Sequence, residues 1–366
     1  MDLNWPIIIV CAVGISLLLT VLIIPQVLHV SLVKRLFDRP NNRKVHNGIV
    51  PRLGGFAFFP VVLVTLGLML IIPAYYADHG SIVGSRDFIL ALPDIIVLLA
   101  AMMVMFMTGL YDDLVGLKYG VKFIAQVIAA VLIVESSEYI VDYNDLFGIT
   151  HTSVVMGKII TGFLLVYVVN ALNLIDGIDG LASGLCAIAL AFFAIVLFAE
   201  NLYIYSMLSW VGCASVFVFW LFNVFGNKKR HTKIFMGDIG SLSIGLFTAF
   251  MVIVIGRQPV TLSAWGVRPL ILVFSPLVIP MLDVIRVFCV RILHGRSPFL
   301  PDKCHIHHLM LSAGMKMRMV MATLLCAQVA LLVLNIWLSY FMGINTVLII
   351  DVVIYIGGIL IINANK

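Results

Sequence analysis

Charged residues are scarce in this chain. Only 11% of its 366 residues are Asp, Glu, Lys or Arg, whereas 62% are hydrophobic. So few charges exclude a soluble globule of this length and predict a polytopic membrane protein. Internal repeats, low-complexity tracts and a hydrophilic stretch long enough for a separate domain are also lacking. We therefore expect a single transmembrane domain over residues 1–366.

Paired cysteines and a basic leader are lacking as well. The six cysteines form no CxxC pair, and all but Cys304 lie in apolar runs. This spacing favours neither a disulfide framework nor a zinc site, so the cysteines are interpreted as small core residues. The first apolar run has the length of a membrane span and no basic residues before it, so we expect a transmembrane helix there and not a cleavable signal.

The apolar runs predict an all-α bundle of about eleven transmembrane helices, or ten if one of the shorter runs does not cross. They lie at about 7–30, 54–73, 89–110, 121–136, 158–175, 181–199, 204–222, 241–256, 267–290, 320–340 and 345–363.

The basic residues are distributed unevenly over the connections between these runs. Of the 23 Lys and Arg, all but Arg86, Lys158, Arg257 and Arg268 fall in the odd-numbered connections, within about one helical turn of them, or at the C-terminus. The positive-inside rule therefore places the N-terminus outside and the C-terminus in the cytoplasm. The cytoplasmic loops are then expected at about 34–53, 111–120, 174–181, 223–240 and 291–319.

The third of these loops joins two strongly apolar runs and holds two acids, Asp176 and Asp179, in the sequence Asn170-Ala-Leu-Asn-Leu-Ile-Asp-Gly-Ile-Asp-Gly180. A carboxylate at a membrane edge needs a cation, a donor or water, so such an acid is a functional-site hypothesis. The alternative is a polar interhelical turn, in which the glycines allow a tight backbone path. Function is favoured because similar clusters recur in the other cytoplasmic loops.

Asp112 and Asp113 are adjacent at the predicted cytoplasmic end of a helix, where the helix dipole disfavours negative charge. Two such carboxylates need a divalent cation, a shared proton or nearby lysines, and Lys118 and Lys122 are the candidate lysines. A solvated helix end is the alternative interpretation.

Asp238 lies in Phe235-Met-Gly-Asp-Ile-Gly-Ser241, just before the apolar run at 241–256. A carboxylate there suits a metal–phosphate complex beside the helix N-terminus, in which the glycines let the backbone approach a ligand; a simple N-cap is the alternative. Oxygen ligands favour Mg²⁺ or Mn²⁺ over zinc.

Two basic clusters complete the cytoplasmic pattern. His305, His307 and His308 lie among cations, and we interpret them as donors to phosphate or sugar oxygens and not as a zinc site. In the first loop, Lys44 and His46 either bind an anionic lipid head group or act as ordinary membrane anchors.

Acids for a divalent metal, cations for phosphates and a membrane location together indicate phosphoryl transfer onto or from a lipid phosphate. Other classes of membrane protein share some of these features, and a CDP-alcohol phosphotransferase is disfavoured because its Asp-Gly-x-x-Ala-Arg signature is absent. An intramembrane aspartyl protease is suggested by Tyr111-Asp112 and Gly237-Asp238, but Phe235 replaces the first glycine of the usual motif, and both acids adjoin basic loops. A proton-coupled transporter would place acids near the midplane and on both faces.

Taken together, the motifs resemble those of the polyprenyl-phosphate N-acetylhexosamine-1-phosphate transferases, the glycosyltransferase family 4. The resemblance covers nearly the whole chain and rests on Gly54-Gly55, Asp112-Asp113, Asn170-x-x-Asn-x-x-Asp-Gly-x-Asp-Gly180, Phe235-Met-Gly-Asp-x-Gly-Ser241, and Ser297-Pro298 followed by Asp302 and His305-x-His-His308. The histidine spacing resembles the WecA and TagO branch, which uses UDP-GlcNAc. The MraY branch has three consecutive histidines instead.

The resemblance implies transfer of N-acetylglucosamine-1-phosphate from UDP-GlcNAc to undecaprenyl phosphate, releasing UMP, with Mg²⁺ or Mn²⁺ as cofactor. This would be the first membrane step of lipid-linked glycan synthesis, at the cytoplasmic face of the bacterial inner membrane. UDP-GalNAc and UDP-MurNAc-pentapeptide are the alternative donors. The expected partners are the UDP-sugar, the lipid phosphate and the bilayer, with no nucleic acid, and a homodimer is left open.

The resemblance also implies roles for individual residues. Asp238 would hold the metal with Asn173, and Asp112 would be the base for the lipid phosphate, supported by Asp113. Asn223 and Phe235 would hold the uracil. The remaining substrate-binding residues would be Asp176 and Asp179 on the nucleotide side, Arg296 with His305, His307 and His308 at the sugar and diphosphate, and Lys44, His46, Lys118 and Lys122.

Overall fold

The computed structural model describes residues 4–36, 50–78, 82–136, 139–227, 230–258, 266–297 and 304–364. Its helices are α1 (Trp5–Val33), α2 (Phe58–Asp78), α3 (Ile82–Val115), α4 (Tyr119–Glu135), α5 (Val154–Leu174), α6 (Leu181–Ala199), α7 (Tyr203–Phe225), α8 (Gly237–Gly256), α9 (Pro269–Phe274), α10 (Val278–Leu293), α11 (Ile306–Ser312), α12 (Met317–Ser339) and α13 (Ile344–Ala364). The 3-10 turns η1 (Leu53–Ala57) and η2 (Ser275–Leu277) and the strands β1 (Asp142–Leu146) and β2 (Ile149–His151) complete it.

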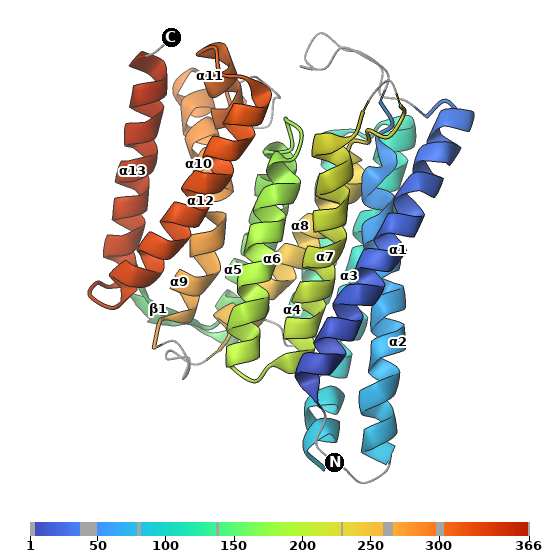
Figure 1. Cartoon of the computed structure of the whole chain (residues 1–366). Coiled ribbons are helices and arrows are strands. Elements are labelled where there is room, and N and C mark those ends of the chain that lie inside the picture. Colours follow the sequence, from blue (N-terminus) through green and yellow to red (C-terminus); the bar gives the residue numbers. More distant parts are fainter. Residues whose placement is uncertain are drawn as a thin grey trace.

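The predicted class, a polytopic helical membrane protein, is confirmed. Within the described residues, ten helical segments are long and apolar enough to cross a membrane. The remaining predicted span is α4, whose 17 residues lie at the short end of the spanning range. The two chain ends lie at opposite ends of the bundle, as an odd number of crossings requires (Figure 1). Which end faces the cytoplasm stays a prediction from the charges.

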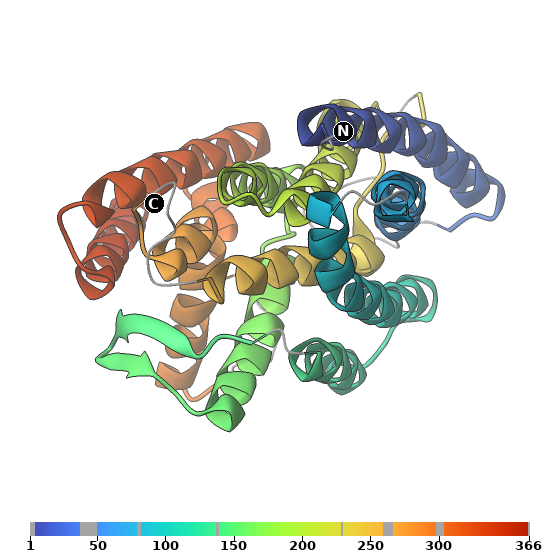
Figure 2. The same cartoon turned by 90° about the horizontal axis from the view of Figure 1, so that it is seen from below.

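Helix α8 is the centre of the bundle. Every residue from Ile239 to Gly256 is buried, because the helix is apolar on all sides and is surrounded by α3, α5 and α6 (Figure 2). Its first turn lies at the same end of the bundle as the last turns of α3 and α5 (Figure 1). Asp238, in that first turn, is therefore placed among the residues that end the neighbouring helices.

The predicted span at 267–290 is not one continuous helix. It divides into α9, η2 and α10, because Pro276 and Pro280 lack the N–H that a continuous helix needs. Gln328 of α12 forms hydrogen bonds with backbone groups on both sides of the break. Its side-chain amide donates to the carbonyl of Ser275 (2.7 Å) and accepts from the N–H of Ile279 (3.0 Å). The carbonyl of Ser275 and the N–H of Ile279, both buried, thus find partners inside the bundle.

The connection between α4 and α5 holds a small hairpin that the sequence analysis did not predict. β1 and β2 pair antiparallel around a turn with positive φ at Phe147 and Gly148. Asn345, at the start of α13, accepts from the N–H of Phe147 and donates to the carbonyl of Asp145, both at 2.9 Å. The hairpin therefore ties the α4–α5 connection to the last helix.

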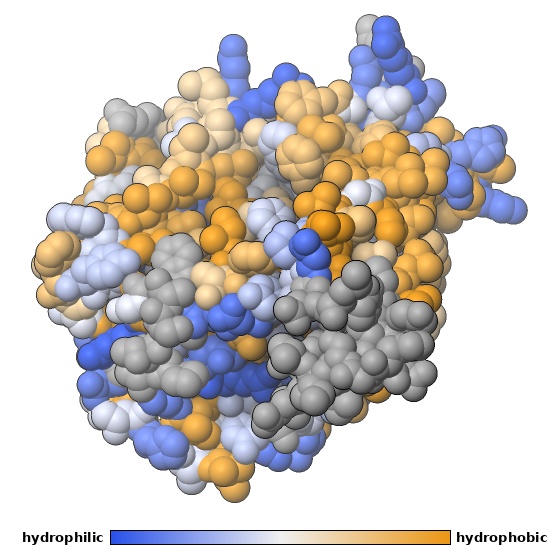
Figure 3. Space-filling view, turned by 60° about the horizontal axis from the view of Figure 1, so that its bottom comes forward, coloured by the Kyte–Doolittle hydropathy of each residue, from blue (hydrophilic) through white to orange (hydrophobic). Residues whose placement is uncertain are grey.

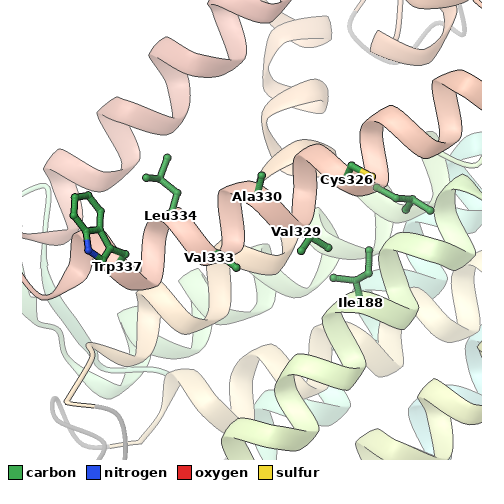
Figure 4. A pocket seen from close by; sticks show the side chains of 8 residues that line it. Ile188, Cys326, Val329, Ala330, Val333, Leu334 and Trp337 are labelled. Carbon is green, nitrogen blue, oxygen red and sulfur yellow. The ribbon is translucent and has the colours of Figure 1, made fainter.

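The flanks of the bundle are apolar. Figure 3 shows hydrophobic side chains over much of the surface, and single residues such as Phe163 and Val353 are 72% and 63% exposed. An apolar groove of about 780 Å³ lies between α6 and α12, with Ile188, Val329 and Trp337 among its lining residues (Figure 4). None of the predicted site residues lines this groove, so the candidate chemistry lies elsewhere.

Candidate active site

Three acids that are far apart in the sequence converge at one end of the bundle. Asp112 and Asp113 come from the last turn of α3 and Asp238 from the first turn of α8, and one carboxylate oxygen of each lies within 4.8 Å of the others. All three are partly buried. Carboxylates this close repel one another unless a cation or a proton lies between them.

Asp113 holds the N-terminus of α8. Its Oδ1 accepts from the N–H of Asp238 (3.1 Å) and its Oδ2 from the N–H of Ile239 (3.0 Å). These are backbone donors that a helix start leaves without partners, and the carboxylate also complements the helix dipole. The capping role that Asp238 itself could have had is thus filled by Asp113 in α3, which leaves the Asp238 side chain to face the site.

Asp112 is compensated by one of the two candidate lysines. Its Oδ1 accepts from the N–H of Leu117 (2.6 Å), and its Oδ2 lies 3.2 Å from Nζ of Lys122. The same ammonium is 3.7 Å from Oδ1 of Asp238, so Lys122 bridges the two acids. Lys118 is exposed and pairs with no acid of the described segments. Lys122 balances only part of the negative charge that the three acids carry when all are ionised.

Asn173, in the last turn of α5, completes the cluster. Its Nδ2 donates to Oδ1 of Asp238 (2.8 Å) and to Oγ of Ser241 (2.7 Å), which leaves its Oδ1 as an acceptor. Carboxylate and amide oxygens are hard ligands that suit Mg²⁺ or Mn²⁺. The donor set and the excess of negative charge therefore fit a divalent cation.

The turn after α5 lies beside these acids. Burial raises the pKa of Asp176 from 3.8 to about 7, and the nearby charges of Asp238 and Asp179 act in the same direction, while the charge of Arg52 opposes them. Asp179 is paired with Lys233, whose Nζ is 2.5 Å from Oδ2. The two acids of this turn thus differ: one is held by a cation and the other is buried among like charges.

The raised pKa of Asp176 predicts a pH-dependent cost to stability. The folded protein binds this proton more tightly than the unfolded chain, so the burial costs nothing below about pH 4 and destabilises increasingly as the pH rises to about 7. We expect Asp176→Asn to stabilise the protein at pH 8 by about 1–4 kcal/mol and to have no effect near pH 4. Melting curves in detergent with EDTA at both pH values measure this.

The control is Asp145→Asn, because Asp145 is an exposed acid in the hairpin, 58% accessible and 3.9 Å from Arg268. It should leave both melting curves unchanged. An equal gain from Asp176→Asn at pH 4 and pH 8 would rule out the ionisation as its cause.

Asn223 is a buried tie between two loops. It is 4% exposed; its Oδ1 accepts from the N–H of Gly180 (2.6 Å) and its Nδ2 donates to the carbonyl of Ile234 (2.8 Å). These bonds give Asn223 a positioning role at the Asp176–Gly180 turn, and its predicted contact with uracil stays a prediction. Phe235, which follows Ile234, forms backbone hydrogen bonds with Pro51 and Gly54.

The histidine segment lies against the same turn. His307 is 1% exposed, and a Cβ placed on Gly177 would lie 2.1 Å from its Nε2, so only glycine fits beside this ring. Both ring nitrogens of His307 are buried without a partner in the described residues. Burial lowers its pKa to about 3, and the neighbouring rings of His308 and His305 add to this. The His307 ring is therefore neutral at physiological pH.

The structure thus brings together Asp112, Asp113, Lys122, Asn173 and Asp238, with the Asp176–Gly180 turn and the histidine segment beside them. Arg296 is exposed three residues after the end of α10, and Lys44 and His46 lie outside the described residues.

Three further residues contribute to the site, although the sequence motifs assign them no individual role. Arg52 adjoins the acids: its carbonyl oxygen would lie 2.2 Å from a Cβ on Gly237, and its charge acts on Asp176. Ser241 bonds Asn173, and Asp283 bonds His305. In the sequence, Arg52 is one of the cations of the first loop, in Pro51-Arg-Leu-Gly-Gly55, and Asp283 is grouped with the loop that holds the histidines.

Fold and site together define a polytopic membrane protein in which carboxylate and amide oxygens gather at one end of the helical bundle, in an arrangement that fits a divalent cation. Residues 95–256 match the family described as Glycosyl transferase family 4. Over 360 residues the chain is 31% identical to the "Probable undecaprenyl-phosphate N-acetylglucosaminyl 1-phosphate transferase" of Bacillus subtilis (strain 168), covering 96% of this chain and 92% of that protein. The chain belongs to this family, and the resemblance inferred from its motifs is confirmed.

Two further relatives have related names. The "Undecaprenyl-phosphate alpha-N-acetylglucosaminyl 1-phosphate transferase" of Escherichia coli (strain K12) is 29% identical over 299 residues, 81% of this chain and 75% of its own. The "Decaprenyl-phosphate N-acetylglucosaminephosphotransferase" of Mycobacterium leprae (strain TN) is 34% identical over 301 residues, 77% of this chain and 71% of its own. The relatives thus share the sugar in their names and differ in the polyprenyl group.

Proposed function

We propose that this protein transfers N-acetylglucosamine-1-phosphate from UDP-GlcNAc to undecaprenyl phosphate and releases UMP. The observation that carries the proposal is the convergence of Asp112, Asp113 and Asp238, with Asn173 and Lys122, at one end of the bundle. Family membership and the names of the relatives support the same reaction. The whole chain would be one catalytic domain of the bacterial inner membrane, with the site facing the cytoplasm.

A divalent ion fits the carboxylates of Asp112 and Asp238 and the amide oxygen of Asn173, and Mg²⁺ or Mn²⁺ suits these ligands. When bound, it would neutralise charge on the diphosphate. Asp113 serves this set indirectly, because both of its oxygens are bonded to the first turn of α8.

In the proposed reaction, an oxygen of the lipid phosphate forms a bond to the phosphorus that carries the sugar, and the bond from that phosphorus to UMP breaks. A phosphomonoester has a second pKa of about 6, so the lipid phosphate is largely dianionic at neutral pH. Asp112 would therefore serve mainly to orient this phosphate through Lys122, whose ammonium faces both Asp112 and Asp238. Direct attack then needs no covalent enzyme intermediate.

The test is to incubate membranes containing the protein with radiolabelled UDP-GlcNAc, undecaprenyl phosphate and Mg²⁺. We expect a labelled lipid and stoichiometric UMP, both abolished by EDTA. Parallel incubations with UDP-GalNAc and with decaprenyl phosphate determine the sugar and the lipid. Cleavage of a membrane peptide at a rate that EDTA does not change would instead indicate a two-aspartate protease.

His307→Ala tests the side of the site that we assign to the UDP-sugar. The ring lies against the Asp176–Gly180 turn, and its two nitrogens lack partners in the described residues. Oxygens of UDP-GlcNAc could therefore form hydrogen bonds with these nitrogens. We expect the KM for UDP-GlcNAc to rise about tenfold, the effect of about one good hydrogen bond, with the KM for the lipid unchanged. An unaltered donor KM would remove His307 from this role. His294→Ala, which changes an exposed histidine, is the matched control.

A further inference from the structure

A buried polar cluster holds the histidine segment from below. Asp283 of α10 is 1% exposed and accepts four hydrogen bonds. Its Oδ2 accepts from Nδ1 of His305 (2.7 Å), and its Oδ1 accepts from Nη2 of Arg286 (2.8 Å), the N–H of Ile306 (3.0 Å) and the hydroxyl of Tyr355 (2.9 Å). A buried carboxylate with this many donors is ionised and fixed in place.

The last helix takes part in this cluster. Tyr355 lies in α13, which stands beside α10 and α11 (Figure 1), and its hydroxyl also accepts from Nε of Arg286 (3.2 Å). Arg286 in turn donates to the carbonyl of Cys304, just before the histidines, at 2.5 Å. The backbone on the N-terminal side of His305 and the N–H of Ile306 on its other side are thus both bound to one network.

This network determines which nitrogen of His305 faces the site. Because an ionised carboxylate can only accept, Nδ1 of His305 must carry the hydrogen. Its Nε2 is then left for the substrate: it accepts from a sugar hydroxyl when the ring is neutral and donates to a phosphate oxygen when the ring is an imidazolium. The His305 ring is nearly parallel to that of His307, with centroids 5.8 Å apart and planes at 10°, so fixing one ring also limits the other.

We propose that Asp283 and Tyr355 are positioning residues that hold His305 by Nδ1 and keep the segment 304–312 against the Asp176–Gly180 turn, ready for the diphosphate of a nucleotide sugar. This inference rests on the proposed function for the identity of that ligand. Tyr355 would thus give α13 an indirect role in substrate binding, although no predicted site residue lies on that helix.

Tyr355→Phe is the mildest test, because it removes one hydroxyl and leaves the ring. We expect the KM for UDP-GlcNAc to rise about tenfold, near the lower limit for one hydrogen bond to a charged group because three other donors still hold Asp283, with little change in kcat or in the KM for the lipid. Tyr203→Phe is the matched control, because it removes an exposed hydroxyl bonded to Asn201 at the other end of the bundle. Asp283→Asn should raise the donor KM further.

A double-mutant cycle separates positioning from a general structural effect. If Tyr355 acts through His305, then Tyr355→Phe should have no additional effect on donor KM in a His305→Ala background. Additive losses, or an equal rise in the KM of both substrates together with a lower melting temperature, would overturn the proposal.

Hydrogen exchange tests the same contacts without any activity. Tyr355→Phe should accelerate amide exchange in residues 304–312 and leave α8 unchanged. If the wild-type protein formed no labelled lipid, the proposed function would fail, and the exchange would still decide whether Tyr355 holds this segment. Unchanged exchange at 304–312, beside a normal wild-type activity, would overturn the positioning role alone.

Discussion

Asp238→Asn should reduce lipid-linked product by at least about a thousandfold while the protein stays folded. The substitution removes a negative charge from a cluster in which three carboxylates lie within 4.8 Å, but it keeps an oxygen that can accept from Asn173. Under the proposed function, Asp238 would hold the divalent ion, and its loss would affect the transition state most, because charge on the transferred phosphoryl group is stabilised there. Stability should be equal or higher, since the acids repel one another.

Three measurements check this expectation: the rate of labelled-lipid formation, the melting temperature in detergent, and Mn²⁺ binding followed by electron paramagnetic resonance. Asp145→Asn is the control, since it makes the same chemical change at an exposed residue of strand β1. Weakened Mn²⁺ binding together with lost turnover would support a ligand role. Near-normal turnover by a purified, well-folded Asp238→Asn protein would refute that role.

The helices could be predicted because a membrane span needs about twenty apolar residues, and each predicted run corresponds to a helical segment. The grouping of the acids followed from the distribution of the cations, since loops that alternate between two faces place Asp112 and Asp238 at the same end. The bundle has both at one end and within 4.8 Å. The broken span was not predicted, although Pro276 and Pro280 are visible in the sequence, because its repair by Gln328 depends on a helix 49 residues further on.

The tasks within the site could not be predicted from residue types alone. Asp112 and Asp113 are adjacent and identical, yet one faces Lys122 and the other caps α8. Which of them faces inward depends on the rotation of α3 against α8, which is set by tertiary packing. Likewise Lys118 and Lys122 are one helical turn apart, and only Lys122 reaches the acids.

The glycines of the site also differ from their sequence interpretation. The sequence predicts that Gly237 and Gly240 leave room for a ligand, but in the structure other parts of the chain pack against them. Gly237 has φ of +71° and packs against Arg52 and Asp113, and Gly240 packs against Met236 and Gly55. Close backbone contact between η1 and α8 therefore positions the start of α8, which carries Asp238.

Gly55→Ala should therefore have an effect far larger than one methyl group suggests. A Cβ on Gly55 would lie 1.9 Å from Cα and 2.3 Å from the backbone nitrogen of Gly240, and backbone atoms cannot rotate away as a side chain can. The added methyl must push η1 from α8, which also strains the bonds from Gly54 to Phe235 and from Gly55 to Met236, both 2.9 Å.

We expect a loss of stability of about 2–4 kcal/mol, at the upper end of the cost of overpacking, because the neighbour is backbone. Activity should fall at least about a hundredfold, since α8 carries Asp238 and a displacement of about 1 Å has that effect in an active site. Gly67→Ala in α2 is the matched control, because nothing lies within 4 Å of a Cβ there and alanine favours a helix. Melting curves and labelled-lipid assays of both variants measure this difference. If Gly55→Ala retained the stability and turnover of Gly67→Ala, the contact between η1 and α8 would have no part in positioning Asp238.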